Sequence, residues 1–151
     1  MKSLFDPEVH AEIQARIENL TPESTASWGK MSVGQMCNHC QMPLEVAMEQ
    51  RFLGGKKPGF MKRLVFKLYK PLMYNDKPWS KNLPTVRDFI ISEDRDVTAE
   101  KTKLAALVTE FHQLKEVTAW PAHPMFGKFT PEQWGKMQYK HLDHHLTQFD
   151  V

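Results

Sequence analysis

The sequence predicts an all-α protein, an up-down-down-up four-helix bundle with a long crossover between its second and third helices. Four stretches of the 151 residues repeat apolar side chains at helical spacing, whereas strand patterns are rare. Two of these stretches open on a capping box, which is typical of a helix start. The connection between the second and third stretches spans dozens of residues, as two neighbouring parallel helices require. We expect residues 1–151 to form a single domain.

The first predicted helix begins after Asp6, where Pro7 suits the first helical position, and ends before Pro22. The residues on its buried stripe are Val9, Ile13 and Ile17. His10 follows the first of them near the start of the helix, and we expect it to lie in solvent.

The second predicted helix begins after Ser32, with Gln35 completing a capping box, and continues to Met48. The residues that share its buried face are Met36, His39, Cys40, Pro43 and Ala47. His39 is therefore expected to point toward the core. Pro43 lacks the amide that would bond the carbonyl of His39, so we expect a kink in this helix.

Cys37 and Cys40 form a C-x-x-C motif inside this helix. A redox C-x-x-C is typical of a helix N-terminus that follows a strand, where the helix dipole lowers the thiol pKa. Here Ser32 begins the helix well before the motif, and no strand pattern precedes it. A thioredoxin-like role is disfavoured, and Cys40 is expected to be a small buried residue near the site.

The long crossover has one amphipathic stretch, residues 60–74, with basic side chains on one side. We expect a solvated face there; the alternative is that residues 56–70 bind an acidic partner or a membrane surface. Residues 54–59 form a loop without the spacing of a phosphate-binding loop. Residues 89–91 either pair briefly as a strand or simply pack.

The third bundle helix is predicted from about Thr98 to Lys115. Its buried stripe consists of Leu104, Leu107, Val108, Phe111 and Leu114, with His112 at the edge. A loop that contains His123 then leads to the last helix.

The last predicted helix begins after Thr130, with Pro131 at its first position and Gln133 completing a capping box. One face carries Trp134, Gln138, His141, Leu142, His145 and Phe149, and the opposite side carries Lys136, Lys140, Asp143, Thr147 and Asp150. His141 and His145, four residues apart on the buried face, lie one above the other. They are either ordinary core histidines or a pair that binds a metal, and a third buried histidine upstream favours the metal.

Composition narrows the classes of partner. The chain has 20 Lys and Arg against 18 Asp and Glu, a balance that does not point to nucleic acid. No stretch approaches the roughly 18 apolar residues of a membrane helix, and the N-terminus lacks the apolar core of a signal peptide. We therefore expect a cytoplasmic protein with neither nucleic acid nor membrane as a partner. A small-molecule substrate is expected from the predicted metal site.

Three groups of residues carry a resemblance to a known family. They are Trp28-Gly29-Lys30-Met31 with Met36-Cys37-Asn38-His39-Cys40, His123-Pro124-Met125-Phe126-Gly127-Lys128, and Gln138-Tyr139-Lys140-His141-Leu142-Asp143-His144-His145. Together they resemble a branch of the DinB/YfiT-like superfamily. The resemblance covers nearly the whole chain and implies an up-down-down-up four-helix bundle with one metal held by His39, His141 and His145. Relatives include metal-dependent hydrolases and thiol-dependent transferases or isomerases, and many are dimers, so a homodimer is expected.

Three neutral imidazoles suit zinc, nickel, iron or cobalt and leave a coordination position open. Such a divalent metal lowers the pKa of bound water towards about 7 or holds a thiol as thiolate. We therefore expect a metal-dependent enzyme that activates water for hydrolysis, or a low-molecular-weight thiol as cosubstrate for transfer. No carboxylate stands out as a base, which slightly favours thiol transfer. His144 and His123 remain as candidates for catalytic proton transfer.

The second hypothesis is a non-catalytic metal- or ligand-binding bundle of the stress-associated kind. A structural metal site is normally closed by a fourth protein ligand, and Cys40 is the nearby candidate.

Overall fold

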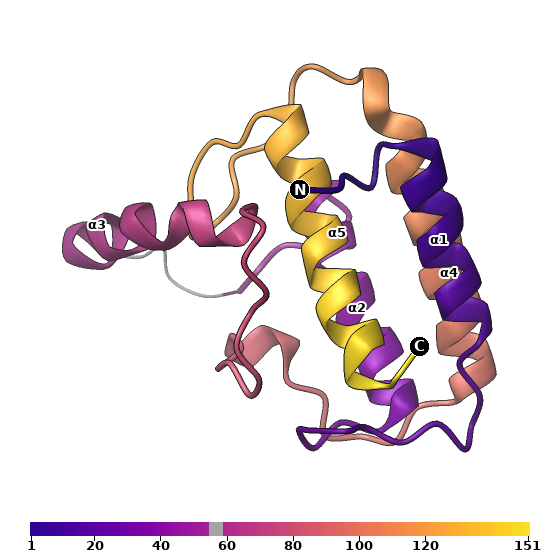
Figure 1. The fold of residues 1–151 in the computed structure, drawn as a ribbon. Helices are drawn as coiled ribbons and strands as arrows, with labels where there is room; N and C mark the ends of the chain where they lie inside the picture. Colours follow the sequence, from indigo (N-terminus) through magenta and orange to yellow (C-terminus); the bar gives the residue numbers. More distant parts are fainter. Residues whose placement is uncertain (55–58) are drawn as a thin grey trace.

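The computed structural model describes residues 1–54 and 59–151, and every regular element in this part of the chain is a helix (Figure 1). The α-helices are α1 (Pro7–Glu18), α2 (Val33–Ala47), α3 (Phe60–Tyr69), α4 (Val97–Gln113) and α5 (Pro131–Gln148). The 3-10 helices are η1 (Lys70–Met73), η2 (Arg87–Phe89) and η3 (Leu114–Glu116). The described residues contain no strand, only an isolated bridge between His123 and Gly127. The prediction of an all-α protein is confirmed.

Four helices, α1, α2, α4 and α5, share one hydrophobic core. α2 packs against both α4 and α5, and α1 packs against the same two helices. The largest fully buried side chains include Leu4, Ile13, Ile17, Met36, Leu44, Leu104, Phe111, Trp134, Leu142 and Leu146. α3 extends away from this core (Figure 1). No helix in the described part of the chain has the length and apolar character to cross a bilayer.

The helix starts follow the local sequence. Both predicted capping boxes are present, at Ser32 before α2 and at Thr130 before α5. α4 begins slightly earlier than predicted, because the Asp96 side chain accepts a hydrogen bond from the amide of Ala99 and caps the helix. Its predicted stripe is buried except for Leu114, which is half-buried in η3.

The crossover decides between two alternatives and divides one predicted stretch. Residues 89–91, expected either to pair as a strand or to pack, form no strand, and η2 turns the backbone at Arg87–Phe89. The predicted amphipathic stretch at 60–74 is divided between α3 and η1. Residues 55–58 of the predicted loop, which include two lysines of the basic 56–70 segment, lie outside the described residues.

His10 is half-buried, and the expectation that it lies in solvent is wrong. Its ring stacks on that of His112 with centroids 4.3 Å apart. The Nε2 atom of His10 lies 3.3 Å from the hydroxyl of Thr109. The packing of α1 against α4 therefore covers a position that the sequence pattern placed at the surface.

The sequence pattern predicts Lys140 on the outer side of the last helix, and this prediction is also wrong. Its side chain is only 4% exposed. The ammonium group donates to the backbone carbonyls of Leu72 and Asn75, at 2.8 Å and 2.9 Å. A buried ammonium needs such acceptors, so Lys140 ties the crossover to α5. The same Leu72 carbonyl accepts a hydrogen bond from the indole of Trp79, which fixes the part of the crossover nearest the site.

Candidate metal centre

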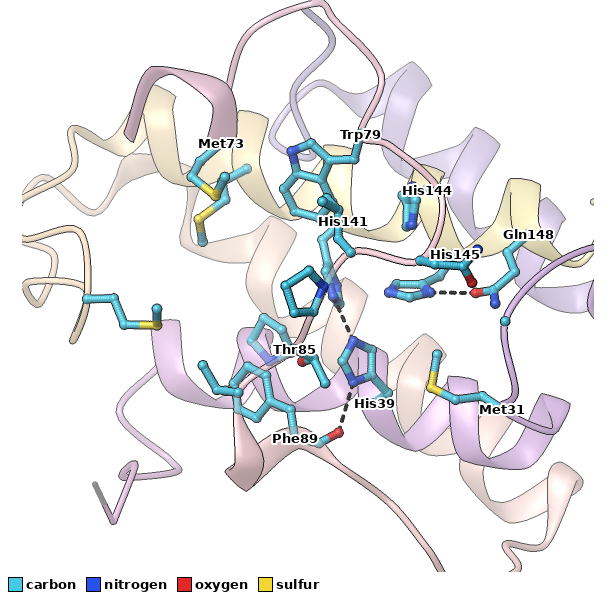
Figure 2. A pocket seen from close by; sticks show the side chains of 18 of the residues that line it. Met31, His39, Met73, Trp79, Thr85, Phe89, His141, His144, His145 and Gln148 are labelled. Atoms are coloured by element: carbon cyan, nitrogen blue, oxygen red, sulfur yellow. Dashed lines mark hydrogen bonds between the residues drawn. The ribbon is translucent and has the colours of Figure 1, made fainter. Parts of the chain in front are cut away.

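The three histidines singled out by the sequence lie together between α2 and α5. One ring nitrogen each from His39, His141 and His145 lies within 4.8 Å of the others (Figure 2). All three side chains are buried, with exposed fractions of 4%, 9% and 9%. Residues about a hundred positions apart therefore meet at one point because α2 and α5 pack against each other.

His39 is oriented by the backbone of the crossover. Its Nδ1 lies 3.1 Å from the carbonyl oxygen of Phe89, so this nitrogen carries the proton and donates it. The Nε2 atom then presents a lone pair, and it lies 3.1 Å from Nε2 of His141. Two nitrogens that each bind an ion at about 2.0–2.1 Å lie roughly 3–3.4 Å apart in a tetrahedral or slightly compressed site. The observed separation fits a shared ion.

His145 is oriented by a chain of two hydrogen bonds. The Gln148 amide nitrogen donates to the carbonyl of Trp28 at 2.5 Å, so the Gln148 side-chain oxygen must face His145. This oxygen lies 2.9 Å from Nδ1 of His145, which therefore carries the proton and leaves Nε2 with a lone pair. Ligand histidines in metal proteins are commonly fixed in this way by a carbonyl acceptor.

Gly29 makes room for this chain of hydrogen bonds. Its φ of +85° is in the left-handed region, where glycine carries no steric cost. A Cβ atom at this position would lie 2.5 Å from the amide nitrogen of Gln148. The Trp28-Gly29 pair therefore supplies both the carbonyl that orients Gln148 and the space that Gln148 needs.

Burial keeps the three imidazoles neutral. It lowers the pKa of His141 well below the usual range and that of His145 to about 3. The pKa of His39 is lowered for the same reason, although its bond to the Phe89 carbonyl opposes the effect. A metal binds the neutral form of histidine, so the cluster is ready for an ion near neutral pH.

Among the described residues, the histidine lone pairs have no adequate hydrogen-bond partner. His39 and His145 each present an Nε2 lone pair, and His141 can offer an Nε2 proton to only one of them. In the described part of the chain, Nδ1 of His141 is also buried without a hydrogen-bond partner. A divalent cation would satisfy the converging lone pairs, and the residues therefore fit a metal ion.

A cavity of about 600 Å³ lies beside the cluster, and all three histidines contribute to its wall. Much of the remaining wall is apolar and aromatic, including Trp28, Trp79, Leu83, Phe89 and Phe126. Among the described residues that line it there is no Asp or Glu, and Lys30 is the one Lys or Arg. This volume and lining are typical of a site for a small organic molecule.

Cys40 does not complete the cluster. Its side chain is fully buried, and its Sγ donates to the sulfur of Met36 at 3.7 Å. Cys40 is absent from the group of close metal-binding atoms, which consists of the three histidines. Burial also raises the pKa of the Cys40 thiol well above its usual value and that of Cys37 to about 12, so both thiols are inert. The prediction that Cys40 is a small buried residue is confirmed.

His144 is half-buried in the cavity wall beside the metal-binding group. Its ring packs against that of His145, with centroids 5.0 Å apart, and against Trp28 and Trp79. Burial lowers its pKa, although nearby Asp143 has the opposite effect. Figure 2 shows the ring between Trp79 and His145.

His123 lines the same cavity but has a structural task. Its Nδ1 accepts hydrogen bonds from the amides of Met125 and Phe126, at 3.1 Å and 3.3 Å. The ring packs against Phe129 and Trp134, and burial lowers its pKa to about 4. One of its two nitrogens is therefore committed to holding the turn that precedes α5.

Sequence reasoning missed the groups that orient the ligands. Gln148 had a usable signal, because an amide three residues after a buried histidine on a helix can reach it. The Phe89 carbonyl had none, since a backbone atom in an irregular crossover leaves no mark in the residue pattern. Trp79, whose ring lies 5.9 Å from that of His141, lies in the same irregular segment.

The model of one protein family, described as "Protein of unknown function (DUF1569)", matches residues 5–151. No curated protein and no solved structure matches the chain.

Proposed function

The chain belongs to the DUF1569 family, and we propose that it is a metal-dependent enzyme that transfers a small thiol to an apolar electrophile. The single observation that carries this proposal is the convergence of three buried, neutral imidazoles on one point beside an apolar cavity. His39, His141 and His145 would hold the ion, which would be zinc, nickel, iron or cobalt by the preference of such ligands.

A divalent metal bound there would lower the pKa of a thiol or water molecule that it coordinates and so supply the nucleophile. The chain's own residues would do the rest. Trp79, Phe89 and the other apolar groups of the cavity would bind the electrophile and exclude bulk water. In the transfer, His144 at the cavity wall would accept the thiol proton, and the thiol sulfur would form a bond to the electrophilic carbon. The bond from that carbon to its leaving group would break, and the leaving group would depart with the bonding electron pair.

The absence of a carboxylate from the described cavity wall supports a thiol rather than water as nucleophile. Hydrolysis normally needs a positioned base to take a proton from water, whereas a thiol loses its proton more readily. Hydrolysis is the second candidate, with His144 and then His123 as bases. The lack of a fourth protein ligand in the described cluster supports a catalytic metal over the structural metal of a non-catalytic, stress-associated bundle.

The order of the helices, the oligomeric state and the cellular location are part of the same proposal. The four core helices would follow the up-down-down-up order of the DinB/YfiT-like superfamily, with the crossover between α2 and α4. The protein would work as a homodimer in the cytoplasm. A packing of α1 and α2 against both α4 and α5 is compatible with that order.

The proposal is tested by an assay of thiol consumption. The full chain is loaded with each metal in turn and mixed with a panel of small thiols and an apolar electrophile. We expect metal-dependent conjugation that His144→Gln reduces by about 10²-fold or more in kcat with the metal retained. A metal-loaded protein that conjugates no thiol but hydrolyses an ester or amide would move the proposal to the second candidate. A metal-loaded protein with neither activity would support the hypothesis of a non-catalytic metal- or ligand-binding bundle.

A further inference from the structure

The surface of α3 carries an unusual concentration of exposed apolar side chains. Among the described residues, seven of the eleven large apolar side chains that are exposed lie between residues 60 and 72. They include Phe60 at 81% exposed, Leu68 at 73% and Leu64 at 49%. Scattered single exposed apolar residues are normal in proteins, but a contiguous group marks an interaction site.

These side chains lie on one side of the helix. At about 100° per residue, Phe60, Met61, Leu64, Val65, Leu68 and Tyr69 occupy one half of α3. In the opposite half, the ring of Phe66 packs against that of Phe126 in the loop before α5, with centroids 5.7 Å apart. The apolar half of α3 is therefore turned outward, as the projecting helix in Figure 1 allows.

The charges beside this apolar face are of one sign. Residues 59–75 contain four Lys and Arg and no Asp or Glu. Lys62 and Lys67 fall near the two borders of the apolar half and are exposed. Cations that flank an apolar face are typical of a helix that lies in the plane of a membrane surface, where long Lys side chains reach the headgroups.

We propose that α3 binds the protein to an anionic lipid surface, with its apolar side chains among the acyl chains and its lysines at the headgroups. This replaces the sequence-based expectation that the chain has no membrane partner. A second copy of the chain fits the face less well, because packing α3 on α3 would bring together the cations that flank the face on both copies. With ten residues, α3 would lie on the bilayer and not cross it.

The test is flotation of the full-length protein with lipid vesicles. Vesicles of phosphatidylcholine alone are compared with vesicles that also contain phosphatidylglycerol, at low and at high salt. We expect the protein to float with the anionic vesicles at low salt and to bind much less to neutral vesicles or at high salt. No flotation with anionic vesicles at low salt would overturn the proposal.

Substitutions separate the apolar and the charged contributions. Leu64→Gln with Leu68→Gln should weaken vesicle binding by about tenfold or more, whereas Val117→Gln, on an exposed apolar residue outside α3, should not. Because all three side chains are exposed, circular dichroism should show unchanged folding.

The charge variants are Lys62→Glu and Lys67→Glu, with Lys115→Glu as control. Each variant on α3 should weaken binding to anionic vesicles by at least about fivefold, and the control should leave it unchanged. Equal binding by all variants would overturn the proposal. So would self-association in sedimentation that Leu64→Gln with Leu68→Gln abolishes while vesicles bind nothing, because a second copy would then cover the face.

Discussion

The Nδ1 atom of His145 lies 2.9 Å from the side-chain oxygen of Gln148, one turn further along α5. The Trp28 carbonyl holds the other end of the same amide. This arrangement fixes both the tautomer and the ring position of His145, so its Nε2 faces His39 and His141 with a lone pair. The geometry of the candidate metal centre therefore depends on a residue that no ion would touch.

Gln148→Leu should weaken metal affinity by about 10–100-fold, because it removes the acceptor that orients His145. Affinity is measured by competition with a chromogenic chelator. Gln113→Leu, on an exposed residue of α4, is the matched control and should leave the affinity unchanged. Unchanged affinity in Gln148→Leu would mean that His145 needs no outer partner.

Gly29→Ala should have a similar but smaller effect on metal affinity, because the new Cβ would push against the Gln148 amide. Gly127→Ala is the control. It also places a side chain at positive φ, +73° against +85°, but the new atom meets open space. Both variants should lose stability by about 1 kcal/mol from backbone strain, and only Gly29→Ala should release metal more readily. If both retained metal equally, the contact with Gln148 would not matter.

Cys40→Ala should keep the metal. The thiol points toward Met36 and lies outside the histidine cluster, so its removal costs about 1 kcal/mol of core packing and no ligand. Cys37→Ala, on an equally buried thiol, should behave the same way. Metal analysis and urea unfolding check both points. Loss of metal in Cys40→Ala alone would support a closed structural site.

The free energy of unfolding should fall as the pH is lowered, in part because His123 becomes protonated more readily in the unfolded chain. Its folded pKa of about 4 lies below the ordinary value of 6.5, so between these values the unfolded chain binds more protons than the folded one. The contribution of His123 to the free energy of unfolding is therefore full above pH 6.5 and declines towards pH 4, by about 3 kcal/mol at most. Urea unfolding of the metal-free protein between pH 7 and pH 4 measures it.

The matched variant is His123→Asn, whose side-chain oxygen can still accept from the turn amides. It should be less stable at pH 7 but lose less stability on acidification than the original chain. The same loss in both proteins would show that His123 titrates normally and is not held neutral by its surroundings.

Much of the framework could be predicted from the sequence. The buried stripes of α1, α2 and α5 and both capping boxes follow from local periodicity, and this placed His39, His141 and His145 on inward faces. Local patterns fail in the crossover, because its course depends on long-range contacts. The hydrogen bonds from Lys140 to Leu72 and Asn75 are an example, since they bury a residue whose helical position indicated solvent.

The outward face of α3 is a second case in which local sequence patterns do not predict which side chains are exposed. Periodicity predicts that residues 60–74 form an amphipathic stretch, but it does not determine which half faces the protein. The contact of Phe66 with Phe126 decides that, and it leaves the apolar half exposed.

The most direct measurement is the metal content of the full chain, purified without a metal-affinity tag, beside that of His141→Ala and His144→Ala. We predict one tightly held divalent metal per chain in the original protein and in His144→Ala, and little or none in His141→Ala, with all three folded by circular dichroism. A metal-free original protein that binds no added zinc, nickel, iron or cobalt, or a His141→Ala variant with undiminished metal, would contradict a metal centre at His39, His141 and His145.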